Sequence, residues 1–240
     1  MRTLAIIPAR GGSKRIPRKN IMNFLGKPMI AYPIENSIRS GIFDEVMVST
    51  EDNEIAEIAK KYGAQIPFMR SEINANDTAG TEDVIFEVLN SYEKLNIHFD
   101  IVCCIYPSTP LLTAESLISS KEKLINENYD SLFPVIRYGH PIQRSMKIVN
   151  GKIQMVWPEN ADVRTQDLEV CYHDAGQYYW MFTNQFKKSK QILTSNTGVI
   201  ELSEMESQDI DNMDDWKLAE LKFLKLNNPS INNNTSSEKV

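Results

Sequence analysis

Short runs of apolar, often β-branched residues alternate in the first half of the chain with amphipathic stretches of helical length. The apolar runs predict strands at Leu4–Ala9, Glu45–Thr50, Ala64–Phe68 and Asp100–Tyr106. The amphipathic stretches predict helices at Met29–Ser40, Asn53–Tyr62, Glu82–Leu95 and Ala114–Asn126. This order of strands and helices predicts an α/β fold, a three-layer αβα sandwich with a predominantly parallel sheet. In such folds ligands bind at the carboxyl ends of the strands.

The pattern changes after an apolar run at Leu132–Val135. Residues 138–172 contain Pro141, Pro158, an Asn150-Gly151 turn and alternating residues from Lys152 to Trp157, which predict a small β excursion from the sheet. The periodicity then predicts strands at Tyr178–Phe182 and Gly198–Leu202 and a closing helix at Asp214–Leu226. We therefore expect one domain over residues 1–226 and a disordered, Asn- and Ser-rich tail over residues 227–240.

Composition supports a folded chain in the cytoplasm. The 240 residues are 42% hydrophobic and 24% charged, which is close to the globular average. The apolar run Leu4–Ala9 is too short for a membrane span of about 20 residues or a secretory core of about 7–15. Three cysteines make no disulfide framework, and the adjacent Cys103 and Cys104 are expected to be buried thiols on opposite faces of a strand.

Charge is distributed unevenly along the chain. The net charge of −6 argues against a nucleic-acid partner. Residues 1–34 nevertheless hold seven basic residues and no acid, whereas Glu201 to Trp216 holds seven acids and no base. The basic end suits a small polyanion such as a triphosphate, and the acidic end suits a divalent cation.

The segment Pro8–Asn20 directly follows the first predicted strand. Two adjacent glycines, Gly11 and Gly12, allow close approach of the backbone to a ligand, and five of the ten residues from Arg10 to Lys19 are cationic. These features predict phosphate binding, although a solvated basic turn is the alternative. The segment matches neither the P-loop pattern nor the glycine fingerprint of dinucleotide-binding proteins, which disfavours a nicotinamide oxidoreductase.

Written as I-P-A-R-x-G-S-K-x-x-P-x-K-N, the segment resembles the N-terminal signature of the sialic-acid-type cytidylyltransferases, which make CMP-nonulosonates from CTP. The resemblance extends from Leu4 to about Leu226. It implies a Rossmann-like, nucleotide-diphospho-sugar-transferase-like fold in which this loop wraps the triphosphate. The nucleotide-binding positions that it implies here are Arg10, Gly11, Gly12, Ser13, Lys14, Lys19 and Asn20.

A second segment, residues 69–81, is similar to the R-x-x-E-x-A-x-D-x-A stretch that covers the cytosine and ribose in that family. The similarity implies nucleotide contacts from Arg70, Asp77, Ala79 and Thr81. From the residues alone this is a polar loop before a helix, with Thr81 as its N-cap.

Two further segments concern the sugar. Residues 106–112 resemble the family's Q-P-T-S-P-L-R, but Tyr106 replaces the Gln and Leu112 the Arg, which favours a sugar other than N-acetylneuraminate. The stretch R-T-Q-D-L…Y-H-D-A-G-Q-Y-Y-W, within residues 164–180, is similar to the subgroup that acts on pseudaminic acid. The implied sugar-binding residues are Tyr106, Ser108, Arg164, Gln166, His173, Gln177 and Tyr179. Arg164 would pair with the sugar carboxylate. A lone histidine such as His173 is also commonly a structural hydrogen-bonding residue.

The acidic end contains Ser207-Gln208-Asp209-Ile210-Asp211, which matches the family's S-x-D-I-D. In an extended segment Asp209 and Asp211 lie on the same side and offer paired oxygen ligands for Mg²⁺. The following Asn212, Asp214 and Asp215 are interpreted as caps of the last helix.

The resemblance implies transfer of CMP from CTP to the anomeric hydroxyl of a nonulosonic acid, with release of pyrophosphate. Arg10, Lys14 and Lys19 would hold the β- and γ-phosphates, while Asp209 and Asp211 would hold Mg²⁺. Residues 138–172 would form a homodimer contact and touch the sugar. The alternatives are an N-acetylneuraminate or legionaminate cytidylyltransferase and, from another class, a non-catalytic nucleotide-binding protein.

Overall fold

The computed structural model describes residues 1–76 and 79–228. Its main sheet has the strand order β11-β6-β10-β5-β1-β4, and β9 pairs with β6. The strands are β1 (Thr3–Pro8), β4 (Glu45–Ser49), β5 (Ile101–Ile105), β6 (Ser131–Arg137), β9 (Tyr172–Asp174), β10 (Tyr178–Phe182) and β11 (Thr197–Leu202). β4, β1 and β5 run parallel, as do β6 and β11, whereas β10 is antiparallel to both its neighbours. The expected α/β class is therefore confirmed.

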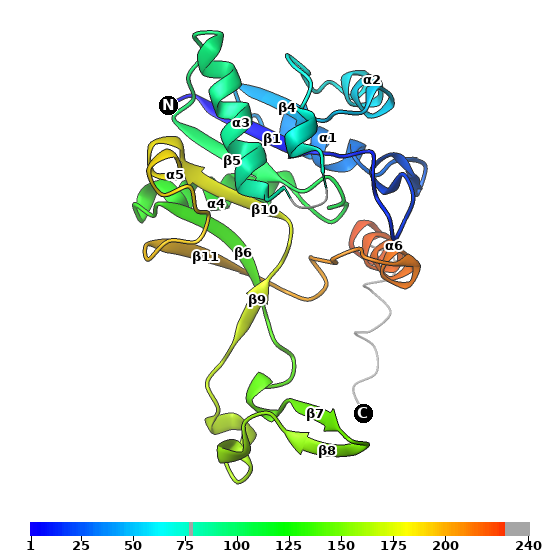
Figure 1. Cartoon of the computed structure of the whole chain (residues 1–240), viewed down its shortest axis with the longest axis vertical. Coiled ribbons are helices and arrows are strands. Elements are labelled where there is room, and N and C mark those ends of the chain that lie inside the picture. The colour runs from blue at the N-terminus through cyan, green and yellow to red at the C-terminus, as the bar shows by residue number, and fades with distance from the viewer. Residues whose placement is uncertain (77–78, 229–240) are drawn as a thin grey trace.

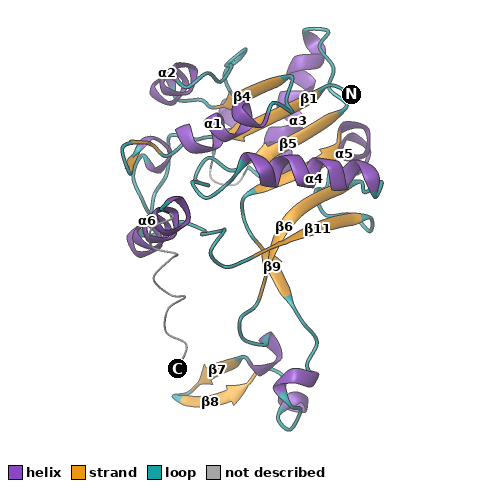
Figure 2. Ribbon diagram, turned by 180° about the vertical axis from the view of Figure 1, so that it is seen from behind, coloured by secondary structure: helices purple, strands orange, loops and turns teal. Residues whose placement is uncertain are grey.

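Helices cover both faces of the sheet, as the two opposite views show (Figures 1 and 2). One face packs against α1 (Ala31–Ser40), α2 (Asn53–Lys61) and α4 (Ala114–Asn126), and the other against α3 (Thr81–Lys94) and α5 (Thr183–Ser189). The alternation of buried residues in the strands produces these two cores. Cys103 belongs to the first and Cys104 to the second, and both are buried free thiols, as predicted.

The last helix, α6 (Met213–Asn227), lies beside the N-terminal loop (Figure 1). Asn212 is its N-cap and accepts hydrogen bonds from the backbone N–H groups of Asp214 and Asp215, as the sequence predicted. Within the described residues no helix combines the length and apolarity needed to cross a bilayer.

Three local predictions differ from the structure. Ala64–Phe68 contributes only an isolated bridge between Gln65 and Met47, with one backbone hydrogen bond from Gln65 to Val46 and one from Val48 to Gln65. Thr81 is the first residue of α3 rather than its cap; the cap is Gly80, whose N–H donates to the Asp83 carboxylate at 3.1 Å. Helix α1 begins at Ala31 rather than Met29, since β3 (Lys27–Pro28) pairs with β2 (Asn23–Phe24) just before it.

The predicted β excursion is present as an arm that projects from the body between β6 and β9 (Figure 1). Its hairpin joins β7 (Met146–Val149) to β8 (Lys152–Met155). Asn150 and Gly151 form the turn with φ of 52° and 73°, the left-handed values that such tight hairpins require. The structure also contains short 3₁₀ helices at Lys19–Ile21, Glu72–Asn74, Ile142–Arg144, Pro158–Asn160 and Thr165–Asp167.

Candidate active site

A cavity of about 470 Å³ lies at the carboxyl edge of β1 and β5. This volume is within the usual range for small-molecule sites. Four segments that are far apart in the sequence form its wall: the loop after β1, the segment before α3, the loop after β5 and the segment before α6. We call it the main cavity. Predicted site residues that line it are Arg10, Ser13, Lys14, Lys19, Asn20, Arg70, Ala79, Thr81, Tyr106, Ser108, Asp209 and Asp211.

A separate apolar cluster brings the two ends of the chain together. Ile16 and Phe24 from the N-terminal region pack with Ile210 and Trp216 from the start of α6. The rings of Phe24 and Trp216 meet edge to face, 5.4 Å apart. Lys19 adds a polar tether, because its Nζ donates to the Ile210 carbonyl at 2.6 Å. Burial of these apolar side chains therefore places Asp209 and Asp211 opposite the cation-rich segment Pro8–Asn20, which we call the basic loop.

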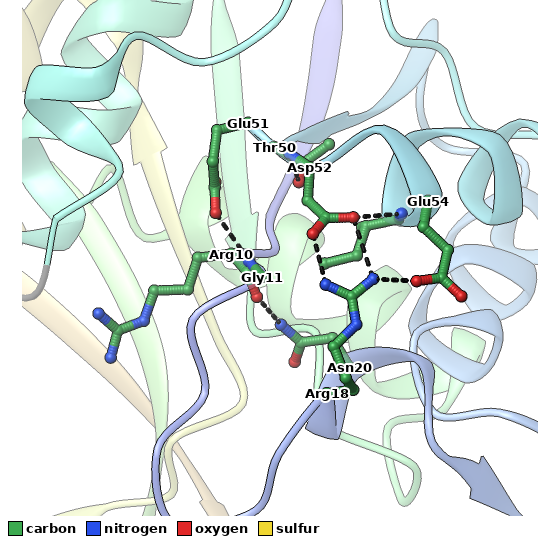
Figure 3. Close-up of polar contacts among 9 residues, drawn as sticks. Arg10, Gly11, Arg18, Asn20, Thr50, Glu51, Asp52 and Glu54 are labelled. Atoms are coloured by element: carbon green, nitrogen blue, oxygen red, sulfur yellow. Dashed lines mark hydrogen bonds and ion pairs between the residues drawn. The ribbon is translucent and has the colours of Figure 1, made fainter.

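The basic loop is fixed at its first turn by two hydrogen bonds (Figure 3). The Gly11 N–H donates to Glu51 Oε1 at 2.7 Å, and the buried Asn20 donates from Nδ2 to the Arg10 carbonyl at 3.0 Å. The side chain of Arg10 extends away from these contacts (Figure 3). A Cβ at Gly11 would overlap the Asp52 carboxylate, so a larger residue here would have to displace that carboxylate from its contacts with Arg18. Gly11 and its neighbour Gly12 lie outside the cavity wall formed by the described residues.

Arg18, another cation of this loop, forms ion pairs that stabilise the fold. It adopts a left-handed conformation with φ of 56° and pairs with Asp52 and Glu54 (Figure 3). Asp52 is the N-cap of α2 and accepts from the Ile55 N–H at 3.0 Å. The hydrogen bond from Arg18 holds the pKa of Asp52 below its usual value. The Arg18–Asp52 pair thus joins the basic loop to α2.

This ion pair predicts a pH-dependent stability. Since the folded pKa of Asp52 is lowered, the pair stabilises the fold above the ordinary aspartate pKa and loses that contribution as the pH falls through the lowered value. Asp52→Asn keeps a capping side chain but removes the charge, so we expect a loss of about 0.5–1 kcal/mol at pH 7 that vanishes in acid. Urea unfolding of both proteins between pH 7 and about pH 2 measures it. In an Arg18→Met background the same substitution is expected to cost much less; an equal cost there would contradict the role of the pair.

Opposite charges face one another across the main cavity. Burial lowers the pKa of Lys19, while Asp209 and Asp211 act in the other direction. Burial, followed by the nearby Asp211, raises the pKa of Asp209. Arg15 Nη2 lies 2.5 Å from Asp211 Oδ1. The acidic segment, residues 207–215, is therefore held against cations of the basic loop.

The carboxylate pair fits a cation that arrives with a nucleotide. Among residues 1–76 and 79–228 no group of three or more His, Cys, Asp and Glu side chains is arranged to hold a metal ion alone. Mg²⁺ is typically bound by one or two carboxylates together with substrate phosphates and water. Asp209 and Asp211 could supply two such carboxylates at the wall of a cavity that Arg10, Lys14 and Lys19 also line.

Of the second predicted segment, Arg70 is the most constrained. It is buried, its Nε donates to Ser49 Oγ at 3.0 Å, and its guanidinium also bonds the Ser49 carbonyl. Burial lowers its pKa, against the opposing effect of Glu51. Ala79 and Thr81 lie with it at the cavity wall. Asp77, predicted with them, lies outside the described residues.

A second cavity of about 460 Å³ adjoins the first. Thr81 and Tyr106 line both, and His173 and Tyr179 line only the second, which we call the side cavity. Phe133 and Leu193 give it an apolar part. Three of the predicted sugar residues therefore meet at this one place.

Three other predicted sugar residues lie elsewhere. Arg164, on the arm, has a side chain that is 73% exposed and donates from Nε to Asp167 Oδ2 at 2.7 Å. Gln166, also on the arm, borders a separate depression. Gln177 is buried and donates to the Glu206 carbonyl at 2.6 Å, which ties β10 to the segment before α6. The projection of the arm explains the position of the first two.

Among the site residues that the sequence analysis did not single out are Glu51, Arg15 and Asn74. Glu51 anchors Gly11, Arg15 pairs with Asp211, and Asn74 lines the main cavity. Glu51 had a usable signal, because it follows the carboxyl end of a predicted strand, where ligand-binding loops begin.

Cations from one end of the chain and paired carboxylates from the other enclose a cavity at the carboxyl edge of an α/β sheet, which is the arrangement of a nucleotidyltransferase. The family model for cytidylyltransferases matches residues 4–225. The chain belongs to the cytidylyltransferase family.

Individual relatives agree with this assignment. A pseudaminic acid cytidylyltransferase from Campylobacter jejuni is 40% identical over 231 residues, which cover 96% of this chain and 99% of that one. A CMP-N,N'-diacetyllegionaminic acid synthase from Legionella pneumophila is 32% identical and covers 96% of this chain and 100% of its own. The solved structure of CMP:2-keto-3-deoxy-manno-octonic acid synthetase complexed with CTP shares the fold, with a TM-score of 0.69 at 16% identity over 94% of this chain and 99% of that one.

Proposed function

We propose that the protein transfers CMP from CTP to the anomeric hydroxyl of a nonulosonic acid, with pseudaminic acid as the preferred sugar. The observation that carries the proposal is the meeting of Arg10, Lys14 and Lys19 with Asp209 and Asp211 around one cavity. The preference for pseudaminic acid is supported by the 40% identity to the Campylobacter jejuni enzyme. It is also supported by Tyr106, which stands where the resembling N-acetylneuraminate enzymes have Gln.

The reaction is an in-line attack by the sugar hydroxyl on the α-phosphorus, with pyrophosphate as the leaving group. Such phosphoryl chemistry depends on positioning and on neutralising charge. Arg10, Lys14 and Lys19 would bind the β- and γ-phosphates and stabilise the pyrophosphate as it leaves. Asp209 and Asp211 would hold Mg²⁺, which when bound neutralises charge on the α-phosphate.

The remaining wall of the main cavity would bind the nucleoside. Ser13 and Asn20 extend the phosphate-binding loop, with Gly11 and Gly12 shaping its backbone. Arg70, Ala79 and Thr81 also line the main cavity, where they would contact cytosine and ribose. Arg70 is buried and makes two hydrogen bonds to Ser49, which fix the position of its guanidinium group in the wall.

The sugar would occupy the side cavity next to the triphosphate site. Tyr106 and Thr81 stand at the boundary, and His173 and Tyr179 lie beyond it. Ser108, in the main cavity, would contact the sugar end that carries the reacting hydroxyl. We interpret Gln177 as a support for this region, given its hydrogen bond to the Glu206 carbonyl.

We further propose that the arm forms a homodimer contact and carries Arg164 and Gln166 to the partner's sugar. Its hairpin exposes a cross-strand pair, Ile148 and Ile153, at 78% and 69%. Exposed apolar patches of this kind mark interaction surfaces. Ile148→Glu is expected to convert a dimer to a monomer in sedimentation equilibrium. A wild-type chain that sediments as a monomer, or a variant that stays dimeric, would refute the contact.

A pyrophosphate-release panel tests the function. CTP, UTP, ATP and GTP are each combined with pseudaminate, legionaminate and N-acetylneuraminate in the presence of Mg²⁺. The expected result is release with CTP and pseudaminate above all other pairs, and none when EDTA is added. Release with legionaminate or N-acetylneuraminate instead would revise the sugar. Binding of CTP without release for every sugar would refute the enzyme activity.

A further inference from the structure

Arg15 forms an ion pair with one of the two carboxylates that we propose for the metal. Its Nη2 lies 2.5 Å from Asp211 Oδ1, and both residues line the main cavity. Asp211 sits on a fixed stretch of backbone, because its N–H donates to Asp215 Oδ2 at 3.0 Å at the start of α6. The oxygen that Arg15 contacts is therefore held at the cavity wall.

The backbone of Arg15 is anchored, whereas its side chain is not enclosed. The next residue, Ile16, is 3% exposed and packs in the apolar cluster with Ile210 and Trp216. The Arg15 side chain itself is 69% exposed. A long, exposed side chain on an anchored backbone can change rotamer without moving the loop. The guanidinium can therefore turn from Asp211 into the cavity that it lines.

A metal ion and the Arg15 guanidinium would compete for Asp211. Both are cations that bind a carboxylate oxygen, and a divalent ion beside a unit positive charge is repelled about twice as strongly as a second unit charge would be. The ion pair is exposed, and exposed pairs contribute little stability. A triphosphate offers a guanidinium several anionic oxygens and bidentate hydrogen bonds, which makes it the stronger partner.

We propose that Arg15 couples the binding of the divalent cation to the binding of CTP, because it competes with the metal for Asp211 until a triphosphate draws its guanidinium away. CTP thereby frees the Asp211 oxygen and gains one further cation. Linkage requires the reverse as well, so a metal on Asp211 releases Arg15 to the triphosphate. This coupling rests on the proposed function, in which the carboxylate pair holds Mg²⁺ and the basic loop binds the triphosphate.

Arg15→Met tests the coupling through two binding measurements that require no turnover. Methionine keeps an unbranched side chain and removes the charge. Binding of Mn²⁺ to the protein without nucleotide, followed by the EPR signal of free Mn²⁺, is expected to become about 10-fold tighter because the competing charge is gone. Binding of CTP in EDTA, followed by calorimetry, is expected to become about 10-fold weaker because one charged contact to phosphate is lost. A merely structural role of Arg15 would weaken both.

Lys27→Met is the matched control for charge. Lys27 is also a cation of the N-terminal region, but it pairs with Glu35, so its removal changes the net charge equally and leaves the Arg15–Asp211 pair intact. Both binding constants are expected to stay within about twofold of wild type. Arg15→Gln is a second variant for the case that Arg15→Met does not fold, and the same two shifts are expected from it.

A double variant shows whether Arg15 acts through Asp211. When Arg15→Met is added to Asp211→Asn, the carboxylate for which the two cations compete is already absent. The gain in Mn²⁺ affinity seen in the single Arg15→Met variant is therefore expected to disappear.

The outcomes separate this coupling from the proposed function. Mn²⁺ binding that is absent, unchanged or weaker in Arg15→Met would overturn the coupling alone, and so would unchanged CTP binding. Equal shifts in Lys27→Met, or a gain in Mn²⁺ affinity that survives Asp211→Asn, would also overturn it. A wild-type protein that releases no pyrophosphate from CTP with any nonulosonate would overturn the proposed function, whatever the two binding constants are.

Discussion

Asp209→Asn is expected to lower the rate of pyrophosphate release from CTP by about 100-fold or more at saturating substrates. Asparagine has nearly the same shape, but it cannot supply the negative charge that, with Asp211, would hold the metal on the α-phosphate. The Asp209 carboxylate lies at the cavity wall with Lys19 close to it. Steady-state kinetics with a coupled pyrophosphate assay, at several Mg²⁺ concentrations, measures the effect.

Asp214→Asn is the control for that substitution. Asp214 belongs to the same acidic segment, but its side chain is exposed and pairs only with Lys217, at 3.3 Å, among the described ion pairs. We expect its activity to stay within about twofold of wild type. Comparable losses in both variants would mean that the overall acidity of the segment matters and that Asp209 has no special place.

Lys19→Ala is expected to reduce kcat/KM for CTP by about 100-fold or more, the range found when a positioned electrostatic group is removed. Two contributions add here. The cation that would neutralise the leaving pyrophosphate is lost, and so is the tether from Nζ to the Ile210 carbonyl that holds the acidic segment against the basic loop. Single-turnover and steady-state rates with CTP and the best sugar of the panel measure the loss.

Lys27 provides the comparison for Lys19. It also belongs to the basic N-terminal region, but it pairs with Glu35 and lies over the ring of Tyr32. Lys27→Ala is expected to retain activity within about threefold. Wild-type turnover by Lys19→Ala would contradict the role of Lys19 in the site. Equal losses in the two variants would show that only the total charge of the region counts.

Much of the fold follows from local patterns in the sequence. The helix Ala114–Asn126 and the strand Tyr178–Phe182 have the boundaries that periodicity predicts. The basic loop and the acidic pair are also visible, because residue type and position after a strand define them. Their meeting is less evident, since it depends on contacts between Phe24 and Trp216, which are 192 positions apart.

Tertiary contacts decide what the sequence does not predict. The reversed direction of β10 comes from the long excursion before it, and Gly80 replaces Thr81 as cap because Asp83 bonds its N–H. The position of Glu51 directly after a predicted strand marks it as a candidate site residue, but its hydrogen bond to Gly11, 40 positions away, depends on the tertiary fold. Arg164 is an arginine in a family motif, but its place on a projecting arm follows from the path of the chain.

The most direct test of the account is a crystal structure of the protein with CTP and Mn²⁺, in which anomalous scattering locates the metal. The account predicts the triphosphate against Arg10, Lys14 and Lys19, the cytidine toward Arg70, and an anomalous peak beside Asp209 and Asp211. A triphosphate bound outside the main cavity, or a metal bound to the triphosphate but remote from both carboxylates, would contradict it.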